Sequence, residues 1–124
     1  MLIRELMKRP FIIEKNISLS EAARMMSEKN IGSLLFMSGG KIKGILTERD
    51  LLRNFGKSEK VSEAMTTKVI TITSDEPLDR AMELMREHEI KRLPVVDAGK
   101  LVGIITLTDL AANFEAVEED FFFE

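Results

Sequence analysis

The chain repeats itself with an offset of 59 residues. When residues 19–51 are aligned with residues 78–110, 13 of the 33 pairs are identical, whereas chance would give about two. Upstream, Met7 matches Met65 at an offset of 58 residues. A single copy of this length cannot cover both faces of its own small sheet, so two copies are expected to pack together. We therefore predict a first repeat over residues 1–54, a linker at 55–60, a second repeat over 61–114 and a tail at 115–124.

Each copy has the pattern of a β-α-β-β-α unit. A helical turn leads to a short extended run, and an amphipathic helix with apolar residues at i, i+3, i+4 and i+7 follows. Two apolar strands joined by a glycine-containing turn then form a hairpin, and a last helix begins at Thr47 or Thr106. The predicted fold class is mixed, α/β (α+β), with the two repeats related by pseudo-two-fold symmetry. The expected turns, runs and strands are Ile3–Met7, Phe11–Ile13, Ser33–Met37 and Lys41–Leu46, then Val61–Met65, Val69–Ile72, Leu93–Val96 and Lys100–Ile105.

The composition argues against an enzyme. The chain has no cysteine and a single histidine, His88, so it lacks the residues for a thiolate site and offers no partner set for a Ser-His-Asp triad or a histidine-based metal site. We expect no catalytic residues and no metal. No apolar run approaches the roughly 18 residues of a membrane span, and we expect a cytoplasmic protein without membrane contact. The net charge of −3 argues against a nucleic-acid partner, although the chain without its acidic tail sums to +2.

The step from strand to last helix carries the same turn in both copies. Gly44-Ile45-Leu46-Thr47-Glu48-Arg49-Asp50 recurs as Gly103-Ile104-Ile105-Thr106-Leu107-Thr108-Asp109. Thr-x-x-Asp is a good helix start, because the hydroxyl caps a free N–H and the carboxylate favours the positive end of the helix dipole. The same groups suit a ligand: free N–H groups bind phosphate, a carboxylate accepts hydrogen bonds from a ribose diol, and glycine leaves room. The two interpretations are compatible, and the pattern alone leaves both open.

The tandem units, the doubled turn and the segment Lys91-Arg92-Leu93-Pro94-Val95-Val96-Asp97 together resemble a pair of cystathionine-β-synthase (CBS) domains, a Bateman module. The resemblance covers about residues 2–115. It implies a regulatory module that binds AMP, ADP, ATP or S-adenosylmethionine as a ligand, with no other cofactor. It also implies clefts that take the Thr and Asp from one repeat and the adenine wall from the other, and further pairing into a homodimer.

Carried over residue by residue, the resemblance gives two unequal sites. Site A would consist of Thr47, Arg49, Asp50, Lys68, Val69, Ile70, Lys91 and Arg92. Site B would consist of Thr106, Thr108, Asp109, Pro10, Phe11, Ile12, Gly32 and Ser33. Site A would hold four basic side chains and site B none, so we expect site A to prefer a ligand with phosphates and site B a less charged adenosine group or no ligand.

The leading functional hypothesis is a non-catalytic sensor that transmits nucleotide occupancy by a change in conformation or assembly. Without an output domain, such a chain would act on its own assembly or on an unknown protein partner. The alternative is a ligand-independent interaction or oligomerisation scaffold, and a nucleic-acid binder is a weaker third possibility. The three adjacent phenylalanines Phe121–Phe123 of the tail are expected to pack onto their own chain or onto a partner.

Overall fold

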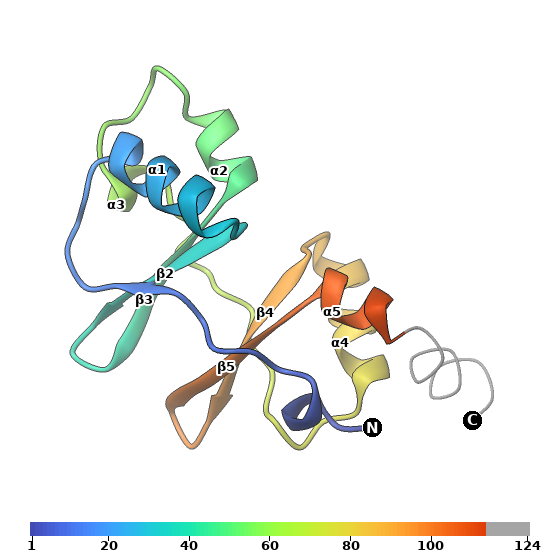
Figure 1. Ribbon diagram of the computed structural model, residues 1–124. Coiled ribbons are helices and arrows are strands. Elements are labelled where there is room, and N and C mark those ends of the chain that lie inside the picture. The colour runs from blue at the N-terminus through green and yellow to red at the C-terminus, as the bar shows by residue number, and fades with distance from the viewer. Residues whose placement is uncertain (114–124) are drawn as a thin grey trace. The chain divides into compact units, whose positions relative to one another are not determined.

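The computed structural model describes residues 1–113, which divide into two compact units (Figure 1). Unit 1 contains Met1–Arg9 and the chain from Ile70 onwards, and unit 2 contains Pro10–Val69. The mixed fold class expected from the sequence is confirmed, because each unit combines helices with a small sheet. The predicted tail at 115–124 lies outside the described residues.

Unit 2 is built on a three-stranded sheet in the order β1-β2-β3. β1 runs parallel to β2, and β2 pairs antiparallel with β3 through a hairpin. Thr66 adds one antiparallel bridge to Ile45 at the outer edge of β3. The elements of this unit are β1 (Ile12–Ile13), α1 (Leu19–Lys29), β2 (Ser33–Ser38), β3 (Lys41–Thr47), α2 (Glu48–Arg53) and α3 (Val61–Ala64).

Unit 1 has a two-stranded sheet, β4 paired antiparallel with β5. The strand predicted at Val69–Ile72 is not formed: only Ile72 makes a parallel bridge, to Val95, with its N–H donating to the Pro94 carbonyl at 3.1 Å. Lys8 makes an antiparallel bridge to Ile104 of β5, as Thr66 does to Ile45 in unit 2. The elements of this unit are the 3-10 helix η1 (Ile3–Glu5), α4 (Leu78–His88), β4 (Arg92–Asp97), β5 (Lys100–Thr106) and α5 (Leu107–Ala112).

The compact units do not coincide with the sequence repeats. The helical turn η1 begins the first repeat but belongs to unit 1, together with the hairpin of the second repeat. The turn α3 begins the second repeat but belongs to unit 2, together with the hairpin of the first. Each hairpin therefore receives the opening turn of the other repeat.

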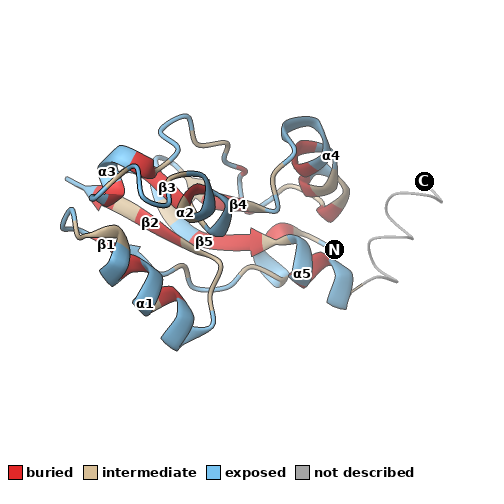
Figure 2. Ribbon diagram, turned by 90° about the horizontal axis from the view of Figure 1, so that it is seen from above, coloured by how far each residue is buried: buried red, intermediate tan, exposed pale blue. Residues whose placement is uncertain are grey.

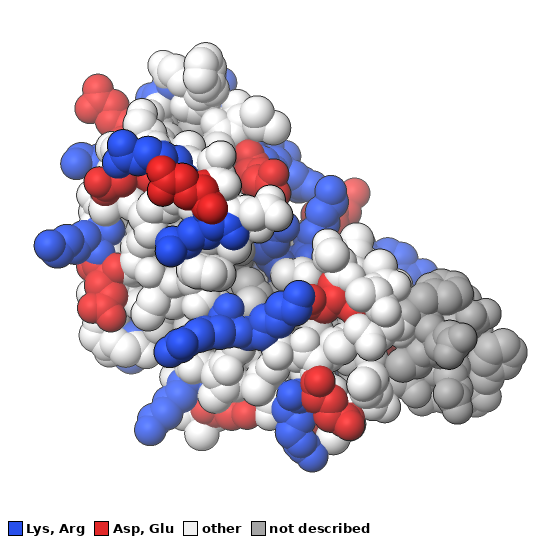
Figure 3. Space-filling model, in the orientation of Figure 1, with Lys and Arg blue, Asp and Glu red and all other residues white. Residues whose placement is uncertain are grey.

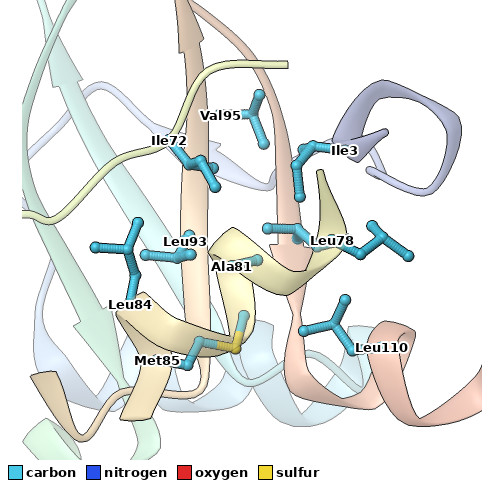
Figure 4. Packing of buried hydrophobic residues seen from close by; sticks show 10 residues of the cluster. Ile3, Ile72, Leu78, Ala81, Leu84, Met85, Leu93, Val95 and Leu110 are labelled. Carbon is cyan, nitrogen blue, oxygen red and sulfur yellow. The ribbon is translucent and has the colours of Figure 1, made fainter. Parts of the chain in front are cut away.

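Each unit has its own cluster of buried apolar side chains. In unit 1, the apolar face of α4 packs on β4, and Ile3 from η1 and Leu110 from α5 are also buried in the cluster (Figure 4). In unit 2, the buried face of α1 contributes Ala22 and Met26, and α3 contributes Val61 and Ala64. The helices show the same division in Figure 2, with buried residues along one face and exposed residues along the other.

The local signals in the sequence set the ends of these elements. Ser18 caps α1, its hydroxyl accepting from the Glu21 N–H at 3.1 Å. The first hairpin turns at Gly39 and Gly40, both with positive φ. The second turns at Ala98 and Gly99, where Ala98 takes a φ of 49°, a left-handed conformation that is costly for an alanine.

Candidate functional site

The Thr47 turn of unit 2 is a reciprocal cap at the start of α2. The Thr47 hydroxyl accepts from the Asp50 N–H at 3.3 Å, while Asp50 Oδ2 accepts from the Thr47 N–H at 2.9 Å and from its hydroxyl at 3.0 Å. The Asp50 side chain is buried, with 7% of its surface exposed. The structural interpretation of this motif, a helix cap, is therefore confirmed.

The Thr106 turn of unit 1 has the same geometry at the start of α5. The Thr106 hydroxyl accepts from the Asp109 N–H at 3.2 Å, and Asp109 Oδ2 accepts from the Thr106 N–H at 3.1 Å and from its hydroxyl at 2.8 Å. Asp109 is 4% exposed. Two buried carboxylates are thus fixed in the same way, each with Oδ1 outside the cap.

Different groups occupy Oδ1 in the two turns. In unit 2 the Thr66 hydroxyl donates to Asp50 Oδ1 at 3.3 Å, whereas in unit 1 the Lys8 ammonium lies 2.7 Å from Asp109 Oδ1. Neither Lys8 nor Thr66 was among the residues predicted from the sequence. The Met7/Met65 match at an offset of 58 makes Lys8 and Thr66 equivalent positions, but nothing in the sequence links either of them to the carboxylates.

The Lys8–Asp109 ion pair changes the charge expected at site B. The sequence predicts no basic side chain beside Asp109, and that prediction is wrong: Lys8 pairs with it directly. The residues that the resemblance implied for this part of site B begin at Pro10, two residues beyond Lys8.

The glycine of each turn makes room for a methionine of the same unit. A Cβ on Gly44 would lie 2.5 Å from Met65 Sδ, and a Cβ on Gly103 would lie 2.7 Å from Met7 Sδ. In the ligand interpretation of the motif, this space is left for an approaching ligand. In the structure a thioether occupies it, so packing alone accounts for the glycine.

The residues predicted for site A are divided between the units. Thr47, Arg49, Asp50, Lys68 and Val69 belong to unit 2, and Ile70, Lys91 and Arg92 belong to unit 1. Within unit 1, strand pairing places Arg92 opposite Thr106, and the Lys91 carbonyl accepts from the Leu107 N–H at 2.8 Å. Association of Lys91 and Arg92 with Thr47 stays a prediction.

The residues predicted for site B are divided in the same manner. Thr106, Thr108 and Asp109 belong to unit 1, and Pro10, Phe11, Ile12, Gly32 and Ser33 belong to unit 2. The Phe11 ring is 42% exposed and lies 5.5 Å from the Lys29 ammonium, a cation–π contact. Within unit 2, Ser33 pairs with Thr47, and the Gly32 carbonyl accepts from the Glu48 N–H at 3.3 Å. Their association with Thr106 also stays a prediction.

The described residues offer hydrogen-bonding and charged groups for a polar ligand. Among residues 1–113, no three His, Cys, Asp or Glu side chains gather closely enough to hold a metal ion. Over that same range, no helix has the length and apolar character needed to cross a bilayer. On the face shown in Figure 3, Lys and Arg side chains are interspersed with Asp and Glu.

Comparison with known proteins shows the family. The profile of the CBS domain matches residues 3–57 and again residues 61–116. The "CBS domain-containing protein YhcV" of Bacillus subtilis is 39% identical over 106 residues, which span 82% of this chain and 76% of that protein. The crystal structure of the CBS domain pair of protein MJ0100, in complex with 5′-methylthioadenosine and S-adenosyl-L-methionine, matches with a TM-score of 0.86 and 34% identity. That match covers 93% of this chain and 96% of the other.

Similar sequence also occurs as a small part of proteins named as enzymes. A homoserine O-acetyltransferase of Methanohalobium evestigatum is 38% identical over 106 residues, but these make up 22% of its length. The match therefore concerns a module within that protein. Since the two profile matches together span most of the chain, the protein belongs to the CBS domain family and contains two CBS domains in tandem.

Proposed function

We propose that this CBS pair is a non-catalytic regulatory module that binds an adenosine compound (AMP, ADP, ATP or S-adenosylmethionine) at its Thr-x-x-Asp turns. The observation that carries the proposal is the pair of buried carboxylates, Asp50 and Asp109, held in one geometry by reciprocal caps. The complex of the similar MJ0100 pair with two adenosine-containing molecules supports the ligand class.

The hydrogen-bond count at each carboxylate leaves room for a contact with one hydroxyl of a ribose. A carboxylate has about four acceptor sites. Asp50 receives three hydrogen bonds, from the Thr47 N–H, the Thr47 hydroxyl and the Thr66 hydroxyl. Asp109 receives two from Thr106 and the ion pair from Lys8. About one acceptor site is left on each, enough for one ribose hydroxyl, and both carboxylates are already fixed before a ligand arrives.

Binding would regulate only through a difference between states. A ligand shifts an equilibrium by no more than its differential affinity for the two conformations or assemblies. We propose that occupancy of the turns changes conformation or assembly, and that a protein partner or a second copy of the chain responds to that change.

Thermal unfolding with added ligands tests the proposal. Adenosine, AMP, ADP, ATP and S-adenosylmethionine should each be added at about 1 mM, because a ligand at 100 times its dissociation constant adds about 2.7 kcal/mol of stability. The matched control is the double variant Asp50→Asn and Asp109→Asn, in which each amide oxygen can still cap its helix but one acceptor oxygen becomes a donor. A higher unfolding midpoint in the wild type that disappears in the variant supports the proposal. Equal behaviour of the two proteins with every compound contradicts it.

A ligand-independent scaffold is the second candidate, and one observation favours it. Leu52 of α2 is 79% exposed and Phe55, just beyond that helix, is 87% exposed. Two large apolar side chains this close in sequence suit a protein interface, including the homodimer expected from the resemblance. Light scattering of the wild type and the Phe55→Ser variant, with Val102→Thr as a surface control, tests this surface: a mass lowered only by Phe55→Ser supports it, and equal masses of all three proteins argue against it.

A further inference from the structure

The two Thr-x-x-Asp turns differ in the group that touches Oδ1 of the buried carboxylate. We propose that Lys8 sets the ligand charge at the Asp109 turn, so that this turn binds adenosine compounds carrying an anionic group, such as a 5′-phosphate, in preference to neutral ones. This inference rests on the proposed function. It assigns to Lys8 the role of a specificity-determining residue.

Lys8 is held against this turn by its backbone. Its N–H donates to the Ile104 carbonyl and its carbonyl accepts from the Ile104 N–H, both at 2.9 Å. Met7, the preceding residue, packs on Gly103 of the same strand. The Cα of Lys8 is therefore fixed at the edge of β5, and only its flexible side chain has to be ordered to reach Asp109.

The Lys8 ammonium is exposed enough to contact a ligand in addition to Asp109. Asp109 is 4% exposed, whereas the Lys8 side chain is 71% exposed. An ammonium has three N–H donors, and the ion pair at 2.7 Å uses one of them. The others face solvent at the rim of the turn, where they can donate to an anion that binds beside the carboxylate.

The same position in unit 2 is neutral. The Thr66 backbone makes the same pair of 2.9 Å hydrogen bonds, with Ile45, but its hydroxyl brings no charge to Asp50. Asp50 with Thr66 therefore sums to −1, and Asp109 with Lys8 sums to zero. At Oδ1, a phosphate beside Asp50 would meet the neutral Thr66 hydroxyl, whereas a phosphate beside Asp109 would meet the Lys8 ammonium.

The strand positions opposite each turn differ in the same direction, whereas within the turns Arg49 of unit 2 corresponds to the neutral Thr108 of unit 1. In unit 1, Arg92 is opposite Thr106, and the Lys91 carbonyl is bonded to the Leu107 N–H. In unit 2, the equivalent positions are Ser33 and Gly32, which carry no charge. This placement opposes the expectation from the sequence, which assigned the phosphate preference to the Thr47 turn.

An exchange of the two residues tests the inference. Calorimetric titrations of the full chain with adenosine and with AMP give the ratio of their affinities, and ¹⁵N–¹H spectra show whether the amides of residues 106–109 or of residues 47–50 respond. The variants are Lys8→Thr, Thr66→Lys and, as a control for net charge, Lys100→Thr at the exposed hairpin end of unit 1. Inorganic phosphate alone, at the same concentration, serves as the control for an adventitious anion.

We expect the wild type to bind AMP more tightly than adenosine at residues 106–109. Lys8→Thr should reduce that preference by about tenfold, the order of one charge-assisted hydrogen bond, with adenosine affinity nearly unchanged. Thr66→Lys should raise the preference for AMP at residues 47–50, and Lys100→Thr should leave both ratios as they are. An unchanged AMP preference in Lys8→Thr, an equal loss of AMP and adenosine, or the same response to phosphate alone overturns the role of Lys8 while leaving the proposed function intact. Absence of binding of every adenosine compound to the wild type overturns both.

Discussion

Substitution of Gly103 by alanine tests whether packing explains the glycine of the Thr106 turn. A Cβ at this position would lie 2.7 Å from Met7 Sδ, 3.0 Å from Met7 Cγ and 3.2 Å from the Lys8 carbonyl oxygen. The methionine side chain can rotate away. The carbonyl cannot move as easily, because it accepts the hydrogen bond from the Ile104 N–H.

Two opposing effects set the magnitude. Overpacking of a well-packed site costs about 1–3 kcal/mol. Replacing glycine by alanine inside a strand returns about 0.5–1 kcal/mol, because the unfolded chain loses freedom. The net loss in the free energy of unfolding should be about 0.5–2 kcal/mol, which lowers the unfolding midpoint by about 2–8 °C for a chain of this size.

Urea and thermal unfolding of four proteins measure the effect: wild type, Gly103→Ala, Met7→Ala and the double variant. Since Met7→Ala removes the two nearest of the three atoms that the new Cβ would meet, the double variant should be more stable than additivity predicts, by at least about 0.5 kcal/mol. Gly44→Ala is the matched comparison, because the three atoms nearest to a Cβ there all belong to the flexible Met65 side chain, and we expect a smaller loss there. Stability of Gly103→Ala equal to wild type, or strictly additive losses, would refute the packing argument and return the space to a ligand.

Three further perturbations have defined outcomes. Ala98→Gly should raise the free energy of unfolding by about 0.5–1 kcal/mol, because the φ of 49° strains an alanine; a loss of stability in urea would contradict this. Thr106→Ala should cost about 1 kcal/mol through the lost cap, with Thr106→Ser retaining most of the stability in the same measurement. Asp97 accepts from the Ser74 hydroxyl and N–H, and these bonds, aided by the Arg4 charge, hold its pKa below the ordinary value. Because the folded pKa is lowered, the stability that these bonds contribute is present above the unfolded pKa of about 4 and is lost as the pH falls through the folded pKa. Asp97→Asn should therefore lose less stability than the wild type between pH 5 and pH 2. Parallel pH profiles of the two proteins would count against this.

The parts of the fold that depend on neighbouring residues could be predicted from the sequence. The caps at Ser18, Thr47 and Thr106 and both hairpins follow from side chains and turns within a few residues of one another. The strand predicted at Val69–Ile72 failed because Pro94 of β4 has no N–H, whereas its counterpart Leu35 donates to the Phe11 carbonyl in unit 2 and so completes the pairing of β1. Unit 1 offers this run a single bridge, at Ile72.

The parts of the site that depend on distant residues could not be predicted. Lys8 and Asp109 are 101 residues apart in the sequence, and no local pattern marks them as partners. The repeat made the prediction harder, because it offers each opening turn two hairpins of nearly the same sequence. The repeats follow the order of the chain, whereas η1 and α3 pack with the hairpins of the opposite repeats.

Chain entropy does not decide between these two pairings. In the structure Met7 lies on Gly103 and Met65 on Gly44, which closes loops of 96 and 21 residues, and the opposite pairing would close loops of 37 and 38 residues. Loop-closure entropy grows as the logarithm of loop length, so the two pairings differ by only about 0.3 kcal/mol, and in favour of the one that is not adopted. Specific contacts must therefore select the observed pairing.

The volumes of the side chains supply such a selection. At the offset of 58, Ile3 and Leu6 of the first turn correspond to the smaller Val61 and Ala64 of the second. The larger pair packs in the cluster that contains Val95, while the smaller pair packs in the cluster where the equivalent strand position holds Phe36. Exchanging the turns would put the large residues in the cluster that holds the phenylalanine and the small ones in the cluster that holds the valine, which would overpack one cluster and leave space in the other. By analogy with core substitutions, either change costs on the order of 1 kcal/mol or more, which exceeds the difference in loop-closure entropy. The same selection of the observed pairing brings Lys8 to Asp109.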